Sequence, residues 1–272
     1  MAAIAWVSPL VAQESSQQAP GNSLPKQLDL SSLPGALVED IFVPVPSEIF
    51  GVLDKLGDPD WRGELPEEGY GTYPDRTRLA LVFGLAVADG FLAVEAEDRE
   101  AIKRIGREIL RLATAIGIQS AVTPHVQSIL EASNRADWGA ILQELDRTQA
   151  TVRETMEEMR DDDLARCVSI GGWLRGTQVA SSLISDSYSQ DKAELLSQPD
   201  IVRHFSGTIL HMDPSIQENE TMVVLSVGLG KIGKIMAASG DVIGADDVAE
   251  IHELCSNLLD SVRSAKPGKE KP

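Results

Sequence analysis

The chain has 272 residues, and its 42 acidic against 24 basic residues give a formal net charge of −18. A charge of that sign repels phosphate backbones, so nucleic acid is excluded as an expected partner. Hydrophobic residues make up 43% of the chain but aromatic residues only 4%, so Leu, Ile, Val and Ala must form most of the core. Such a core suits helix packing better than a β-sandwich, and the chain is long enough to bury it.

The N-terminus, MAAIAWVSPLVAQESSQQ, is an apolar run followed at once by small and polar residues. A secretory signal peptide has this kind of apolar region before its cleavage site, so residues 1–13 are interpreted as a signal peptide. The basic residues that usually open a signal are missing, because the first Lys or Arg is Lys26. Either the true start lies upstream or the run only resembles a signal. The expected location is periplasmic or secreted, and cytoplasmic if the run is not a signal.

The rest of the chain divides into three segments by composition. Residues 14–45 are rich in Ser, Gln, Pro and Gly with little periodicity, which is typical of an extended leader or linker. A helical domain is predicted over residues 46–264, opening with a short helix from Ser47 to Leu56. The last residues, 265–272, are polar and indicate a disordered tail.

A long loop is predicted between Asp58 and Asp75. It holds three of the chain's seven Trp and Tyr residues, Trp61, Tyr70 and Tyr73. Loops of this length are uncommon in compact domains, and aromatic side chains usually anchor such a loop to the core. A structural lid is therefore the favoured interpretation. The functional alternative is the rim of a groove for a ligand or partner, lined by these residues together with Trp173 and Arg175.

Residues 76–117 predict two antiparallel helices, the first capped by Asp75 and the second running from about Glu97 to Ala115. The connector contains ADG at residues 88–90 and the acidic stretch EAEDRE. Over some fifteen residues this resembles the ADG-then-acidic-helix pattern of tellurite-resistance TerB-like helical domains, and the resemblance implies acidic residues that can bind metal. The residues themselves favour a helix C-terminal turn at Asp89 and a helix N-terminus after it.

Further helices follow wherever apolar residues recur at helical spacing. Pro124 is expected at the first position of a helix that ends near Asn134. The run of aspartates at 161–163 lacks the spacing of a calcium-binding loop, so it is interpreted as a capped turn. The other expected helices cover residues 137–159, 164–184, 190–196, 199–212, 221–238 and 246–263.

The stretch TMVVLSVGLGKIGKIMAA at 221–238 contains Gly228, Gly230 and Gly233 in GxGxxG spacing. This spacing opens a dinucleotide-binding unit only between a strand and a helix, with a second strand after it. The chain that follows is too short and too rich in helix formers to provide the rest of that sheet. A single buried helix is favoured. The predicted fold is all-α, an irregular bundle of about ten helices with close-packed, glycine-containing core helices.

Few residues suggest chemistry. Asp200 and His204 are four positions apart on one helix, and His211 and Asp213 follow, which makes these four a candidate metal or acid/base site. However, His204 and His211 are separated by about 10 Å of helix rise. No GxSxG motif occurs, and no cofactor is indicated. The two cysteines, Cys167 and Cys255, pair in an oxidising compartment or remain as buried thiols.

The leading hypothesis is an exported, non-enzymatic helical protein that binds a protein partner or small ligand in a groove between glycine-lined helices. The alternative is a metal-dependent or acid/base hydrolase that uses the four residues named above. No integral membrane span is expected, because Lys231 and Lys234 interrupt the best apolar stretch.

Overall fold

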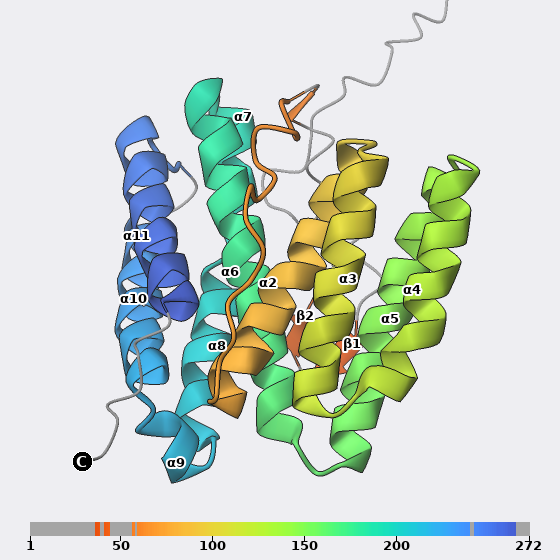
Figure 1. Cartoon of the computed structure of the whole chain (residues 1–272). Helices are drawn as coiled ribbons and strands as arrows, with labels where there is room; N and C mark the ends of the chain where they lie inside the picture. The colour runs from red at the N-terminus through yellow and green to blue at the C-terminus, as the bar shows by residue number, and fades with distance from the viewer. Residues whose placement is uncertain (1–35, 39–40, 44–55, 58, 240–241, 265–272) are drawn as a thin grey trace, which may run out of the picture.

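The computed structural model describes residues 36–38, 41–43, 56–57, 59–239 and 242–264. Most of its regular elements are helices arranged side by side (Figure 1), so the predicted all-α bundle is confirmed. One element was not predicted, an antiparallel hairpin of β1 (Ala36–Val38) and β2 (Ile41–Val43). It lies in the segment expected to be extended, where apolar and β-branched residues favour strands. The predicted signal peptide, the helix from Ser47 and the C-terminal tail lie outside the described residues.

The helices follow one another with short connections. Their bounds are α2 (Arg76–Glu95), α3 (Arg99–Ile116), α4 (Gln119–Asn134), α5 (Trp138–Glu158), α6 (Asp162–Asp186), α7 (Gln190–Ala193), the 3₁₀ helix η3 (Glu194–Leu196), α8 (Pro199–His211), α9 (Pro214–Gln217), α10 (Glu220–Ala238) and α11 (Ala245–Arg263).

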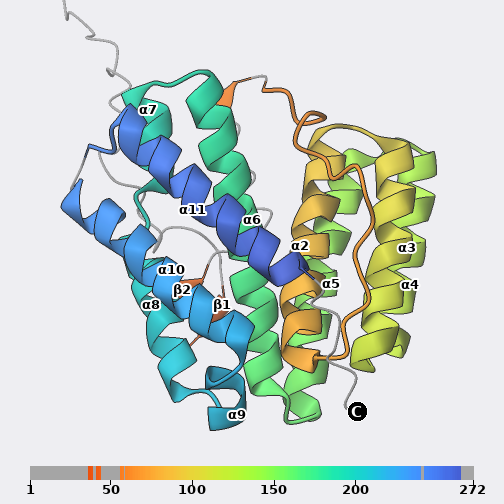
Figure 2. The same cartoon turned by 60° about the vertical axis from the view of Figure 1, so that its left-hand side comes forward.

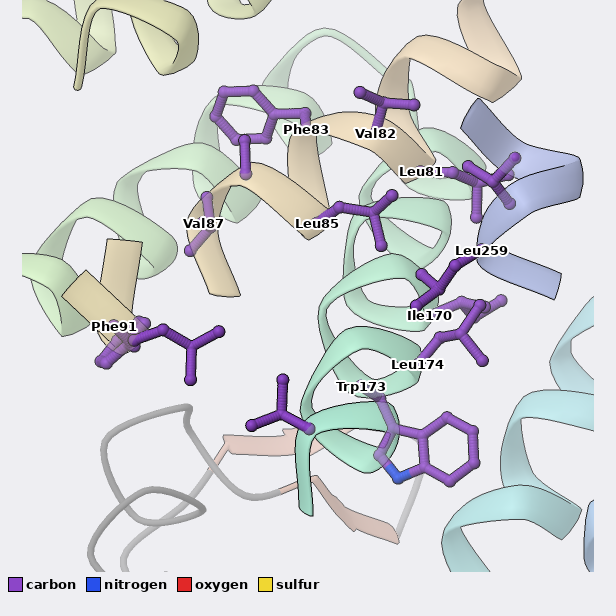
Figure 3. Close-up of a cluster of buried hydrophobic side chains, with 14 of the residues drawn as sticks. Leu81, Val82, Phe83, Leu85, Val87, Phe91, Ile170, Trp173, Leu174 and Leu259 are labelled. Atoms are coloured by element: carbon purple, nitrogen blue, oxygen red, sulfur yellow. The ribbon is translucent and has the colours of Figure 1, made fainter. Parts of the chain in front are cut away.

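Helix α2 is the centre of the bundle and contacts α3, α5, α6 and α11. Every residue from Leu79 to Val94 is buried, which is the pattern of a helix that is apolar on all sides. Figure 3 shows Leu85 of α2 near Leu174 of α6, with Leu259 of α11 in the same cluster. Since each fully buried large apolar side chain contributes about 1.5–3 kcal/mol, this contact is a main source of stability.

Two glycines let α2 and α6 touch backbone to backbone. A Cβ atom added at Gly84 would lie 2.0 Å from the carbonyl oxygen of Val168, and one added at Gly171 would lie 2.1 Å from that of Leu81. No side chain fits at such distances, so glycine is required at both positions. The prediction that glycine-containing core helices pack closely is confirmed here.

Several helix ends match their predicted caps. The carboxylates of Asp75, Asp98 and Asp137 each accept hydrogen bonds from backbone N–H groups in the first turn that follows, as acidic N-caps do. The aspartates at 161–163 lie where α5 gives way to α6, but Asp161 makes no side-chain cap hydrogen bond and Asp162 and Asp163 belong to the first turn of α6, so the expected cap is not formed there.

Two boundaries were wrong. Helix α2 continues through Asp89 and Gly90 to Glu95, because the apolar residues after Gly90 remain in the core and their burial outweighs the helix penalty of glycine. Asp89 is therefore not a turn residue. Helix α4 begins at Gln119, so Pro124 lies inside it. Val122, ahead of the proline, is fully buried, and that packing outweighs the hydrogen bond lost at Pro124.

Helix α10 is continuous from Glu220 to Ala238 and is capped by the side chain of Asn219. The strand and turn that a dinucleotide-binding unit needs around Gly228 are therefore not formed, and that alternative is wrong. Figure 2 shows α10 and α11 side by side at the surface of the bundle. A Cβ at Gly228 would lie 2.5 Å from Leu258 of α11, and one at Gly233 would lie 3.0 Å from Val202 of α8, so these two glycines also permit close packing.

Candidate functional site

The loop before α2 is fastened to the core by its aromatic residues and by arginines from the helices. Tyr73 is buried and its hydroxyl donates to the backbone oxygen of Arg263 at 3.0 Å. Arg111 of α3 donates to the backbone oxygen of Tyr70 at 2.7 Å. Trp61 is partly buried against the hydrophobic core. These contacts support the interpretation of the loop as a structural lid.

Beneath this loop lies a buried ionic cluster, formed by Tyr70, Asp89, Arg175 and Arg263. Asp89 of α2 is fully buried, and its Oδ1 atom accepts a hydrogen bond from Nε of Arg175 at 2.8 Å. Its Oδ2 atom accepts one from the hydroxyl of Tyr70. Arg263, in the last turn of α11, places Nη2 3.9 Å from the same Oδ2. The cluster therefore joins the loop to three helices.

The electrostatics of the cluster identify its role. Arg175 also donates to Gln178 and to the backbone oxygen of Glu64, so each of its three guanidinium nitrogens has a hydrogen-bond partner inside the protein. Burial, followed by the nearby carboxylate of Asp89, raises the pKa of Tyr70 well above its ordinary value, and this phenol remains a donor at neutral pH. A buried carboxylate must be paired to be tolerated, and here both oxygens are. We therefore interpret the cluster as a structural lock between the loop and the helices.

One atom of the ionic cluster is left without a hydrogen bond among the described residues, Nη2 of Arg263. The side chain of Arg263 is 35% exposed as a whole, although the Nη2 atom itself is buried. We assign it to partial compensation of the buried Asp89 charge, since the two groups lie 3.9 Å apart.

The predicted groove residues do not form one lining. Tyr70 and Arg175 meet at Asp89, and Tyr73 touches the neighbouring end of α11. Trp173 instead faces α8, where its indole N–H donates to Oε1 of Gln198 at 3.0 Å and its ring lies 5.6 Å from that of Phe205. Positions 173 and 175 are about 200° apart around a helix, so the two side chains leave α6 in opposite directions.

The predicted metal residues are each engaged locally. Asp200 forms an exposed ion pair with Arg203, and Nδ1 of His211 lies 2.8 Å from the carbonyl oxygen of Gly207. Asp213 caps α9, and the ring of His204 packs near Phe205. In the part of the chain that the structure describes, no three His, Cys, Asp or Glu side chains gather as metal ligands would. The four residues named for the hydrolase alternative therefore do not form one metal-ligand group among the described residues.

A polar trio between α4 and α5 was not predicted. His125 places Nδ1 2.7 Å from Glu144 and Nε2 3.0 Å from the hydroxyl of Thr151. This is the order of carboxylate, imidazole and hydroxyl found in nucleophilic triads. However, all three residues lie in helix interiors, where backbone N–H groups are already bonded to the preceding turn, so no oxyanion hole is formed. The trio links two helices, and no sequence motif marks it.

Both cysteines are free and buried, which confirms the interpretation as two buried thiols. Burial raises the pKa of Cys167 and of Cys255 to about 12. Thiolates are the reactive form of cysteine, so neither residue is a candidate nucleophile.

The outer face of α10 exposes several apolar side chains to solvent. Val223, Val224 and Val227 are 49%, 40% and 58% exposed. Gly230 continues the same face, with no atom within 4 Å of the position a Cβ would occupy, and Lys231 and Lys234 complete it. This set is called the α10 face below. Among the described residues, helix α10 packs mainly on α8, α9 and α11, and the three valines lie on its exposed side.

Two helices are long and apolar enough to cross a membrane by length and composition, α2 and α10. In the most apolar window of α2, 94% of the residues are buried inside the protein, compared with 39% in α10. A core helix passes the same test when it is buried as α2 is. The expectation that the chain has no integral membrane span stays a prediction.

The fold and these sites define a helical bundle with a buried ionic lock and one exposed apolar helix face. Comparison of the chain with protein-family models, with curated proteins and with solved structures finds no match.

Proposed function

We propose that the protein is an exported, non-enzymatic helical protein that binds a protein partner through the α10 face. The observation that carries this proposal is the exposure of three valines on consecutive turns of one helix. Contiguous apolar surface of this kind is a common mark of a protein interaction site. Its burial against a partner contributes about 25 cal/mol for each Å² removed from water.

The binding surface differs from the one first expected. The groove between glycine-lined helices is closed where α2 meets α6, because Gly84 and Gly171 bring the two backbones into contact. Gly230 behaves differently, since it lies on the exposed side of α10 and its missing side chain faces open space. A partner helix can approach α10 closely at this position.

The hydrolase alternative has no comparable support. Asp200, His204, His211 and Asp213 have separate local partners. The His125 trio lacks the backbone donors that stabilise an oxyanion. The ionic cluster does not offer a competing binding site, because Arg175 forms its hydrogen bonds with Asp89, Gln178 and Glu64 of the same protein.

Export is proposed from the apolar N-terminal run followed by small residues. The test is cell fractionation followed by determination of the mature N-terminus. Cleavage near Ala12 or Gln13 in the exported fraction supports export, while an intact chain in the cytoplasm contradicts it.

The test of the interaction places a photoactivatable cross-linking amino acid at Val227 in the full-length protein in cells. The matched control carries the same group at Gln127, which is exposed on α4. We expect a discrete cross-linked protein band from position 227 and none from position 127. Equal patterns from the two positions would contradict a binding role for the α10 face.

A further inference from the structure

The exposed residues of α10 repeat at alternating intervals of four and three. Glu220, Val224, Val227, Lys231 and Lys234 are all exposed and follow this spacing. Intervals of four and three keep side chains on one stripe of a helix, which is the pattern of a seam between two paired helices. The stripe is long enough to pair, because 19 helical residues span about 28 Å.

Charge is distributed unequally along this stripe. The acidic residue, Glu220, stands at the N-terminal end, the valines occupy the middle, and the two lysines stand at the C-terminal end. A parallel pair of such helices would bring like charges together. An antiparallel pair, related by a two-fold axis perpendicular to the helices, brings the acidic end of each helix to the basic end of the other.

The register of that antiparallel pair follows from the spacing. If Val227 lies on the two-fold axis, a residue a given number of positions before Val227 faces the residue the same number of positions after Val227 in the other copy. Glu220 then faces Lys234 of the other copy, and Val224 faces Gly230. The valine side chain meets the open space at the glycine, where nothing lies within 4 Å of a Cβ position. Val223 lies against the aliphatic stem of Lys231, as lysine stems often cover apolar surface.

We propose that the partner of the α10 face is a second copy of this chain, which pairs through an antiparallel α10 contact centred on Val227. This inference rests on the proposed function, since it names the partner of the same face. The complementarity of one helix with itself favours a second copy over an unrelated protein. The net charge of −18 disfavours an anionic lipid surface. Because a single helix pair is smaller than a standard stable interface, the dimer is expected to dissociate at about 1–100 µM.

The experiment is sedimentation equilibrium of the purified full-length protein from about 1 to 300 µM. The wild type is expected to shift from the mass of one chain to that of two. Val227→Glu places two like charges at the axis and removes two apolar contacts, so dimerisation should weaken at least about 100-fold. The control, Gln127→Glu on α4, adds the same charge at an exposed site elsewhere and should leave the mass unchanged.

A charge-reversal pair tests the orientation. Glu220→Lys and Lys234→Glu are each expected to weaken the dimer several-fold, and the double variant should restore it to within about 3-fold of the wild type. Circular dichroism of each variant verifies that the fold is retained. Restoration is not expected from substitutions that merely damage the surface, so it supports the antiparallel register specifically.

A protein that remains monomeric at every concentration overturns this inference, as does a dimer unaffected by Val227→Glu. If the purified protein is monomeric but position 227 cross-links to a different protein in cells, the proposed function stands and the second copy is excluded. If neither contact is found, both proposals fail. Pelleting with vesicles of anionic phospholipid that is lost in Val227→Glu would identify a lipid surface instead and also overturn the inference.

Discussion

Helices α2 and α10 are similar in sequence character and opposite in environment. Both are apolar, both contain glycine, and both are long enough to span a bilayer. In α2, Gly84 faces α6 across a backbone contact and the helix is buried on all sides. In α10, Gly228 faces α11, but Gly230 and three valines face solvent.

The difference shows that glycine in an apolar helix carries two separate meanings. Where a neighbouring backbone occupies the space of the missing Cβ, glycine is a packing requirement. Where that space is open, glycine costs about 1 kcal/mol of helix stability without any return inside the monomer. The open space at Gly230 on the α10 face agrees with an approach by another chain.

The largest expected effect concerns the buried charge of α2. Asp89→Asn leaves Arg175 as an unpaired buried cation, and we expect unfolding free energy to fall by about 3–5 kcal/mol in urea denaturation. The double variant Asp89→Leu with Arg175→Met removes both charges and should lose less than the single variant. Equal losses would show that the unpaired charge of Arg175 is not the cause of the destabilisation.

The next effect tests the closed crossing of α2 with α6. Gly84→Ala places a methyl group 2.0 Å from the Val168 carbonyl oxygen, so the helices must separate, and we expect a loss of about 1–3 kcal/mol or more. The matched control is Gly176→Ala on α6, where nothing lies within 4 Å. That variant should be neutral or more stable, by up to about 1 kcal/mol. If Gly84→Ala leaves stability unchanged, close backbone packing does not distinguish α2 from α10.

The third effect uses the cysteines, because Cys167 lies on α6 beside the α2 crossing and Cys255 lies on α11. The folded-state pKa of each is about 12, above the ordinary value of 9.0, so their contribution to stability is complete below pH 9 and lost between pH 9 and 12. We expect unfolding free energy at pH 10 to fall by about 1 kcal/mol per thiol relative to pH 8. Cys167→Ala and Cys255→Ala should each reduce that loss.

The same thiols report local opening. At pH 8, single-cysteine variants should react with a thiol reagent only through opened forms, and Cys255 should react faster than Cys167 because the layer of α10 and α11 is peripheral. Faster reaction of Cys167 would show that α6 opens more readily than the layer of α10 and α11, which contradicts the prediction.

The smallest effect is expected at the α10 face. Gly230→Ala fits the open space beside α10 and should stabilise the monomer by up to about 1 kcal/mol, measured by urea denaturation below the dimer concentration range. In the dimer, the added methyl group meets Val224 of the other copy and should weaken association. If the monomer is stabilised and association is unchanged, Gly230 does not lie in the dimer contact.

The helices and many of their caps were predictable from sequence because both depend on local chemistry. Asp75 and Asp137 precede amphipathic or apolar runs, and each caps a helix as expected. Predictions from local chemistry were wrong at the helix boundaries that are set by packing in the core. Residues after Gly90 stay helical because they remain in the core, and the helix α4 extends ahead of Pro124 because Val122 is buried.

The ionic cluster was predictable only in part. Arg175 was named as a residue of the candidate groove, and the structure pairs it with a buried carboxylate instead. The partner, Asp89, was assigned to a turn because ADG precedes an acidic stretch. A stronger signal was available, since one carboxylate in the middle of a long apolar run needs a buried cation. The α10 face could not be separated from a core face by sequence, because three valines fit either environment.

The contacts of Arg263 and Tyr73 join the two ends of the helical unit, since 190 residues separate them along the chain. Asp89 likewise pairs with Arg175, which lies 86 residues later in the chain. During synthesis, which proceeds from the N-terminus, α2 therefore emerges well before α6 and α11, which pack against it. The ionic cluster is completed only by the final turn of α11, so a nascent chain that stalls before residue 263 lacks the contacts of Arg263 with Asp89 and Tyr73.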